Sequence, residues 1–166
     1  MKVLLKELSV PEAKEIHDMV LEIGPGENGF VNGLFTEDDE IFSEKITDYF
    51  NMARAIQLEP QYVPQTIYWL YIDGHPAGYG KLRHYLNEKL LDRGGHIGYV
   101  IRPSYRCKGY GKLILAELLK KAKEMKIENV LLTCDEVNTA SRRIIESNNG
   151  VLTELKEGIC KYWIKT

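Results

Sequence analysis

The sequence of residues 99–125 is "YVIRPSYRCKGYGKLILAELLKKAKEM". It begins as an apolar β-rich run, passes through a loop with two glycines, and continues with the apolar spacing of an amphipathic helix. The first N–H groups of a helix have no partner inside the helix, and Gly109 and Gly111 would let a ligand approach them closely. We therefore predict that the backbone amides of residues 107–112 bind an anion, such as a phosphate or pyrophosphate. Three side chains add positive charge to this loop: Arg106, Lys108 and Lys112.

Two familiar phosphate-binding patterns do not describe this loop. A Walker loop needs Gly-Lys-Ser or Gly-Lys-Thr after four variable residues, and the chain lacks that sequence. The dinucleotide pattern Gly-x-Gly-x-x-Gly needs a third glycine at position 114, where the chain has Ile114. Taken alone, the loop also fits a solvated, glycine-rich turn between a strand and a helix. Its function therefore depends on the sequence around it.

The rest of the chain alternates short strands and helices. Strand patterns occupy residues 2–9, 66–72, 76–86, 94–102, 129–134, 150–155 and 159–166. Helix patterns begin at Pro11, at Thr36 as a capping residue, after the 106–112 loop and at Asn138, and residues 24–33 read as a breaker-rich loop. This order predicts an α+β fold, an α/β sandwich with a mixed sheet, in a single domain over residues 1–166.

The composition limits the classes of function. The 166 residues are 44% hydrophobic and 28% charged, and their net charge of −2 gives no field that would attract nucleic acid or an anionic membrane. We expect neither a signal peptide nor a transmembrane segment. An odd number of widely separated cysteines predicts reduced thiols in a cytoplasmic protein. The cysteines are Cys107, Cys134 and Cys160. No histidine shows metal-ligand spacing, so no metal site is expected.

Two motifs resemble those of one family. The spacing Arg106-x-x-Gly109-x-Gly111, directly after a strand and opening a long helix, resembles the coenzyme A pyrophosphate loop of the GNAT superfamily of acyl-CoA-dependent N-acyltransferases. The stretch "NTASRRIIESNNGV", residues 138–151, resembles the later motif of the same superfamily. The resemblance covers roughly residues 1–23 and 66–166, and residues 24–65 match only as the variable region that builds the acceptor site. It implies a mostly antiparallel central sheet flanked by helices.

The resemblance also implies where acetyl-CoA binds. The pantetheine arm would pair with the strand before the loop, at Tyr99, Val100 and Ile101. The pyrophosphate would be held by Arg106, Cys107, Lys108, Gly109, Tyr110, Gly111 and Lys112. Asn138 and Ser141 would contact the arm from the other side. Asn138 also fits a plain helix cap that accepts from the amide of Ala140 or Ser141, and both roles are compatible.

The catalytic groups are less clearly marked. Many family members use a tyrosine seven residues after the motif asparagine as a general acid, and this position is Ile145, so Tyr99 or Tyr105 would have to replace it. For the general base the strand offers His96, which alternation places on one face with Gly98 and Val100. A half-buried structural histidine fits the pattern equally well. Carboxylates just before the strand, acting through water, are the alternatives: Glu88 and Asp92.

The sequence therefore predicts an N-acetyltransferase that moves an acetyl group from acetyl-CoA directly to a primary amine in a ternary complex. The acceptor, a small molecule or a peptide, is not identified by the sequence, and a homodimer is compatible with the class. Acylation of Cys107 or Cys134 would be a more complicated route. One rival interpretation is a non-catalytic acyl-CoA-binding regulatory module, which the isoleucine at position 145 favours. A second rival is a phosphate or nucleotide binder that uses the same loop.

Overall fold

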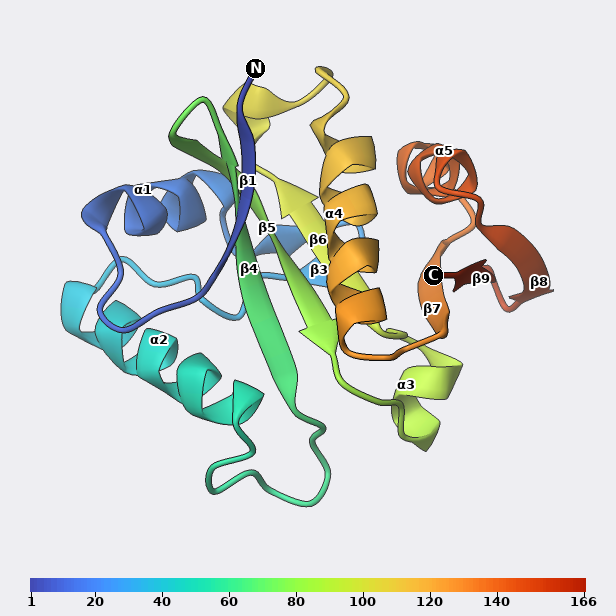
Figure 1. The fold of residues 1–166 in the computed structure, drawn as a ribbon, viewed down its shortest axis with the longest axis horizontal. Helices are drawn as coiled ribbons and strands as arrows, with labels where there is room; N and C mark the ends of the chain where they lie inside the picture. Colours follow the sequence, from blue (N-terminus) through green and yellow to red (C-terminus); the bar gives the residue numbers. More distant parts are fainter.

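Two antiparallel sheets form the frame of the structure, a computed structural model that describes residues 1–166 (Figure 1). The first sheet has the spatial order β1 (Val3–Glu7), β4 (Gln65–Ile72), β5 (His75–Arg83) and β6 (Ile97–Ile101). The second has the order β7 (Asn129–Asp135), β9 (Ile159–Lys165) and β8 (Val151–Lys156). All the strand pairs are antiparallel, so the predicted α+β fold with a mostly antiparallel sheet is confirmed.

Helices cover both faces of the first sheet (Figure 1). The helices are α1 (Lys14–Ile23), α2 (Asp39–Ala53), a short α3 (Glu88–Asp92), α4 (Tyr110–Glu124) and α5 (Thr139–Ser147). α1 and α2 lie on one face, α4 crosses the other, and α5 packs beside α4 and β7. None of these helices combines the length and the apolar character that crossing a membrane would require.

The two faces of the first sheet carry separate apolar cores. On the α4 side, the helix buries Ile114, Leu115, Leu118 and Ala122, as its apolar spacing predicts. On the side of α1 and α2, the largest buried side chains are Trp69 and Tyr79, whose rings meet edge to face. Their polar atoms are also satisfied, because Trp69 donates to Glu12 at 2.9 Å and Tyr79 donates to Asn32 at 2.6 Å. These cores fix the position of β5 and β6.

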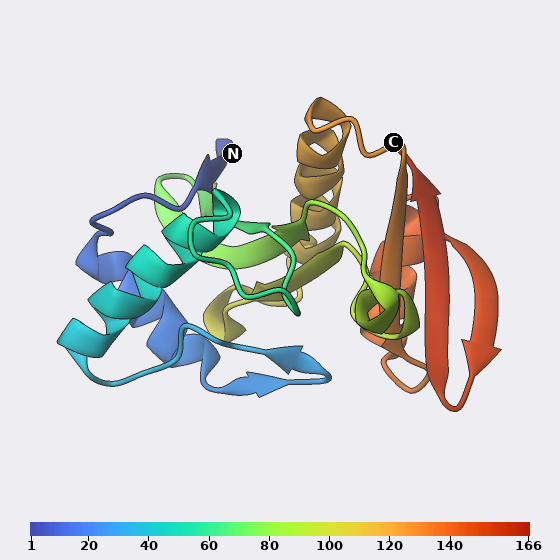
Figure 2. The same ribbon diagram turned by 90° about the horizontal axis from the view of Figure 1, so that it is seen from below.

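The two sheets meet at one point and then diverge. The backbone N–H of His96, just before β6, donates to the carbonyl of Leu131 in β7 at 2.8 Å. This is the one backbone hydrogen bond that joins β7 to the segment preceding β6. Beyond it, β6 and β7 belong to different sheets, and Figure 2 shows the second sheet standing apart from the first. The separation leaves one edge of β6 without a neighbouring strand.

Three local predictions are corrected by the structure. The segment 24–33 is not a plain loop, because it contains a small hairpin of β2 (Gly26–Glu27) and β3 (Phe30–Val31). The cap of α2 is Asp38, whose carboxylate accepts the N–H of Ile41 at 2.9 Å, and not Thr36. Thr36 instead accepts from the backbone N–H of Asp38 at 3.2 Å. The sequence prediction also missed α3, whose Asn87 cap accepts from Leu90.

Candidate functional site

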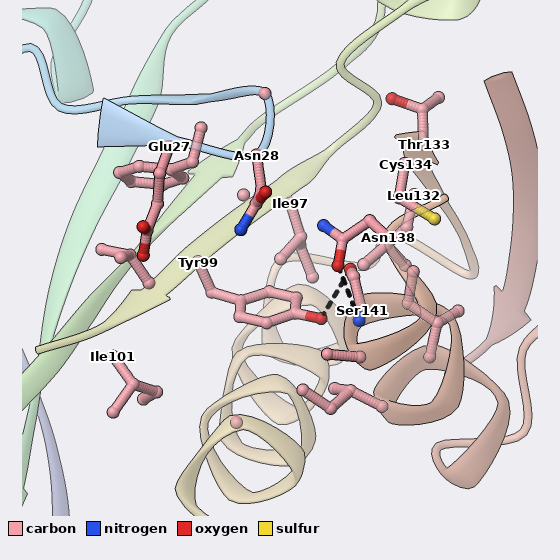
Figure 3. A pocket seen from close by; sticks show the side chains of 18 of the residues that line it. Glu27, Asn28, Ile97, Tyr99, Ile101, Leu132, Thr133, Cys134, Asn138 and Ser141 are labelled. Atoms are coloured by element: carbon pink, nitrogen blue, oxygen red, sulfur yellow. Dashed lines mark hydrogen bonds between the residues drawn. The ribbon is translucent and has the colours of Figure 1, made fainter. Parts of the chain in front are cut away.

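A cavity of about 740 Å³ lies where β6 and β7 diverge. Its wall is formed by β6, the 105–112 loop, β7 and α5, and the β2–β3 hairpin contributes residues from the opposite side (Figure 3). Elements distant in sequence therefore meet at one concave site, which is the usual form of a ligand-binding pocket.

The start of α4 presents a row of unpaired backbone donors to this cavity. None of the N–H groups of residues 107–112 has a hydrogen-bond partner in the structure, and the cap residue Gly109 offers no side chain. Gly109 has φ +81°, and a Cβ added there would meet no atom within 4 Å. Gly111 has a different role, since a Cβ there would lie 2.6 Å from Cδ1 of Ile144 on α5, whose side chain would have to move. The loop that is predicted to bind an anion is therefore open to a ligand at Gly109 and packed against Ile144 at Gly111.

The free edge of β6 supplies a second set of backbone groups, which no neighbouring strand pairs. Hydrogen bonds at the two ends of the β5–β6 pair run from Arg83 N–H to the His96 carbonyl and from Arg102 N–H to the Ala77 carbonyl. The register between these ends has no shift. The alternation of an antiparallel pair then directs Val100 to β5, and the backbone groups of Tyr99 and Ile101 away from it. The Ile101 carbonyl accepts from Nε of Arg106 at 3.0 Å, so this edge faces the cavity side.

Tyr99 crosses the cavity from β6 to α5 (Figure 3). Its hydroxyl lies 3.1 Å from Oγ of Ser141, and burial raises the pKa of Tyr99 to about 12. Asn138 caps α5, because its side-chain oxygen accepts the N–H of Ser141 at 3.2 Å. The cap interpretation of Asn138 is thus confirmed, and the residue lines the cavity as well. Ile145, where the family tyrosine would stand, is buried in the core.

Two ion pairs lie in the cavity wall, one on the β2–β3 hairpin and one on β7. Glu27 of the hairpin forms an ion pair with Arg106 of the loop. Arg93 pairs with Asp135 of β7 at 3.0 Å, and the hairpin residue Gly29 lies next to this pair. Both carboxylates of the cavity wall therefore face an arginine. Sequence patterns do not predict the Glu27 pair, because its residues are far apart in the chain and the hairpin strands are only two residues long.

Most of the predicted site residues meet at this cavity. The members that line it are Tyr99, Val100, Ile101, Arg106, Cys107, Gly109, Tyr110, Gly111, Lys112, Asn138 and Ser141. Lys108 does not, because its side chain is exposed and its ammonium lies 5.3 Å from the ring centre of Tyr105. The alternative carboxylates Glu88 and Asp92 lie on α3, outside the lining.

His96 also lies outside the lining of the cavity. Its side chain is buried, and its Nδ1 accepts the N–H of Leu131 at 2.9 Å. Burial, reinforced by the positive charge of Arg83, lowers the pKa of His96 from 6.5 to about 4. An imidazole with this pKa and no access to the cavity is poorly suited to take a proton from an amine near neutral pH. The geometry supports the structural interpretation of His96, not the catalytic one.

The sequence prediction missed several cavity residues. Lys81 and Arg83 of β5 both belong to the wall, and neither was singled out. Their two-residue spacing on a predicted strand beside β6 is the signal that could have found them. Cys134 of β7 lines the cavity and also packs against the core on the α4 side of the sheet. Burial and the neighbouring Cys160 raise the pKa of the Cys134 thiol to about 11.

Comparison with known proteins places the chain in a family. Residues 32–150 match the model of the acetyltransferase (GNAT) family. No curated protein sequence matches the chain. The fold resembles the Campylobacter jejuni N-acetyltransferase PseH in complex with acetyl coenzyme A, with a TM-score of 0.64 and 10% identity over 99% of both chains.

Two other solved structures share the fold. One is RimL, a ribosomal L7/L12 alpha-N-protein acetyltransferase in complex with coenzyme A, with a TM-score of 0.72, 15% identity and coverage of 99% of this chain and 94% of that one. The other is an acetyl transferase from Salmonella typhimurium that modifies the N-terminal serine of L7/L12, with a TM-score of 0.69 and 15% identity. That match covers 100% of this chain and 96% of the Salmonella typhimurium chain. With a family match across most of its length and this shared fold, the chain belongs to the GNAT family of acetyltransferases.

Proposed function

We propose that this acetyltransferase moves the acetyl group of acetyl-CoA directly to a primary amine within a ternary complex. The observation that carries the proposal is the meeting at one cavity of two sets of backbone groups that have no helix or strand partner. These are the amides of residues 107–112 and the free edge of β6. The first set suits a pyrophosphate and the second suits an extended arm with amide groups.

The binding site of acetyl-CoA follows from this arrangement. The pyrophosphate is assigned to the amides of residues 107–112, with Arg106 and Lys112 supplying positive charge. The pantetheine arm is assigned to the edge of β6, where it adds to the strand through Ile101 and Tyr99. The complexes of PseH with acetyl coenzyme A and of RimL with coenzyme A support this use of the fold.

The reaction forms a C–N bond and breaks the C–S bond of the thioester. The amine nitrogen attacks the carbonyl carbon, and the free N–H of Tyr99 stabilises the oxyanion that develops. Glu27, the carboxylate that the β2–β3 hairpin brings to the cavity wall, is assigned as the acceptor of the proton that the amine loses, directly or through a water molecule. The Tyr99 hydroxyl, oriented by Ser141, protonates the departing thiolate, replacing the tyrosine that position 145 lacks.

The acceptor reaches the thioester from the side of the β2–β3 hairpin. RimL is named as an acetyltransferase of a protein α-amine, and PseH is named as an N-acetyltransferase. Both names support an amine acceptor for this chain. The proposed cytoplasmic location rests on the three unpaired cysteines, since reducing compartments keep thiols free.

The experiment that tests the function is acetyl-CoA turnover with a panel of amines. The panel covers polyamines, aminoglycosides, amino acids and peptide N-termini, and mass spectrometry identifies the acetylated product. Amine-dependent release of CoA together with an N-acetylated product supports the proposal. Binding of acetyl-CoA without turnover by any class of amine favours the rival regulatory module. Binding of ATP in preference to CoA favours the rival nucleotide binder.

A further inference from the structure

Strand β5 contributes two cations to the cavity wall beside β6. Lys81 and Arg83 are two residues apart, so their side chains leave the same face of the sheet. The register pairs Lys81 with Gly98, three residues before Ile101 and at the end of β6 away from the 106–112 loop. Lys81 and Arg83 therefore lie at the end of the cavity away from the loop assigned to the pyrophosphate. We call this the acceptor end of the cavity.

Neither cation has an acidic partner. Glu27 and Asp135, the carboxylates of the cavity wall, pair with Arg106 and Arg93. Lys81 donates to the carbonyl of Val31 at 2.6 Å, and its ammonium lies 4.5 Å from the ring centre of Phe30. Arg83 donates through Nη1 to the carbonyls of Gly94 and Gly95, at 3.2 and 3.1 Å. All these partners are neutral, and an ammonium with three donors and a guanidinium with five retain unused N–H groups.

This arrangement has a cost in the free protein. Lys81 is only 8% exposed, and burying a charge without a counter-ion is unfavourable. Burial lowers the pKa of Lys81 to about 8, with the positive charge of Arg83 as the second cause. Burial also lowers the pKa of Arg83. An anion bound between the two side chains would offset both the desolvation and the mutual repulsion.

We propose that Lys81 and Arg83 bind an anionic group of the acceptor, so that the acceptor is a primary amine that also carries a carboxylate or a phosphate. The inference rests on the proposed function, because it names the substrate class of the same site. It excludes purely cationic acceptors such as polyamines, which would meet two unpaired positive charges. The acidic residues at the start of α2 do not compensate them, because none of them lines the cavity.

The test uses matched probes on protein saturated with CoA, so that the phosphates of CoA already occupy the loop. Phosphoethanolamine is compared with ethanolamine, and β-alanine with β-alaninamide, at constant ionic strength. Binding is measured by isothermal titration and by the thermal unfolding midpoint. We expect at least one anionic probe to bind tenfold or more tightly than its partner, which corresponds to about 1.4 kcal/mol. The pair that responds distinguishes phosphate from carboxylate.

Variants separate this binding from folding and from the proposed function. Lys81→Met keeps the length of the side chain and should remove the preference, Lys81→Arg should retain it, and the exposed control Lys6→Met should not change it. Equal responses to both members of each pair, including no response at all, overturn the inference. CoA titration of the same proteins gives the independent readout, because normal CoA binding without an anion preference overturns only this inference.

Discussion

Both the imidazole and the backbone of His96 hydrogen-bond to Leu131, at the point where the two sheets separate. Its Nδ1 accepts the N–H of Leu131 at 2.9 Å, while the backbone N–H of His96 donates to the Leu131 carbonyl at 2.8 Å. One residue thus supplies Leu131 with both a donor and an acceptor, as a neighbouring strand would. The cavity opens directly beyond this junction.

The burial of His96 at this junction should make the stability of the fold depend on pH. Burial, reinforced by the positive charge of Arg83, lowers the pKa of His96 from 6.5 to about 4 in the folded state. Protonation of Nδ1 would in addition remove the acceptor for the Leu131 N–H. The unfolded chain then binds more protons between these values, and the free energy of unfolding falls as the pH is lowered from about 6.5 to about 4. His96→Gln keeps an acceptor and should lose this part of the slope in urea titrations. His96→Ala should cost about 1–3 kcal/mol at pH 7.5. An unchanged slope in the glutamine variant would contradict the assignment.

Tyr99 is predicted to act as the proton donor to the thiolate. Tyr99→Phe removes the hydroxyl, and kcat should fall about tenfold to a hundredfold, the low end for an acid catalyst because a thiolate is a fair leaving group. Because burial raises the pKa of Tyr99 to about 12, the wild-type rate should show no falling limb below about pH 11 from this group. Ser141→Ala should show a smaller loss. Affinity for CoA, measured by titration, should stay within about threefold in both variants. A normal kcat in Tyr99→Phe would exclude this role.

Cys134 is predicted to be dispensable. A thiol with a pKa raised to about 11 is almost entirely protonated at neutral pH and is a poor nucleophile. Cys134→Ser should therefore keep kcat within about threefold. Intact-protein mass spectrometry of the wild type with acetyl-CoA and no amine should show no stable acetyl adduct. A loss of more than a hundredfold, together with an acetylated enzyme, would establish a covalent intermediate instead.

Glu27 links the acceptor side to the coenzyme loop. If it accepts the proton of the amine, Glu27→Gln should lower kcat by about a hundredfold. The same change releases Arg106 from its ion pair, so CoA should bind as tightly as in the wild type or more tightly. Steady-state kinetics and CoA titration on the same preparation check both parts. Weaker CoA binding with an unaltered kcat would show that Glu27 only shapes the loop.

The coenzyme side of the site could be predicted from the sequence because its signals are local. The glycines of the loop, the strand before it and the helix after it all lie within residues 94–125, and the structure brings them together as expected. Asn138 and Ser141 follow from the second motif in the same way. In both cases the chemistry depends on backbone geometry that neighbouring residues determine.

The acceptor side could not be predicted because its geometry depends on contacts between distant segments. The β2–β3 hairpin has strands of two residues, too short for an alternating pattern, and its position is defined by partners such as Arg106. The surroundings of His96 depend on a distant segment in the same way. Its carbonyl accepts from Arg83 and so continues the β5–β6 pairing, but its imidazole contacts Leu131 of the other sheet, which no local pattern predicts.

Acetyl-CoA is proposed to bind through the amides at the start of α4, and calorimetric titration of Gly109→Val with CoA measures whether it does. The matched control is Gly74→Val, because Gly74 has φ +85° and, like Gly109, no atom within 4 Å of an added Cβ. Both variants should lose similar stability, since each places a branched residue in the left-handed region.

Wild type and Gly74→Val should bind CoA, prefer it to ATP, and gain about 2.7 kcal/mol of stability when CoA is present at about a hundred times its dissociation constant. Gly109→Val should lose at least about tenfold in affinity, or about 1.4 kcal/mol. Normal CoA binding by a folded Gly109→Val, or no CoA binding by the wild type at millimolar concentration, would contradict binding through these amides.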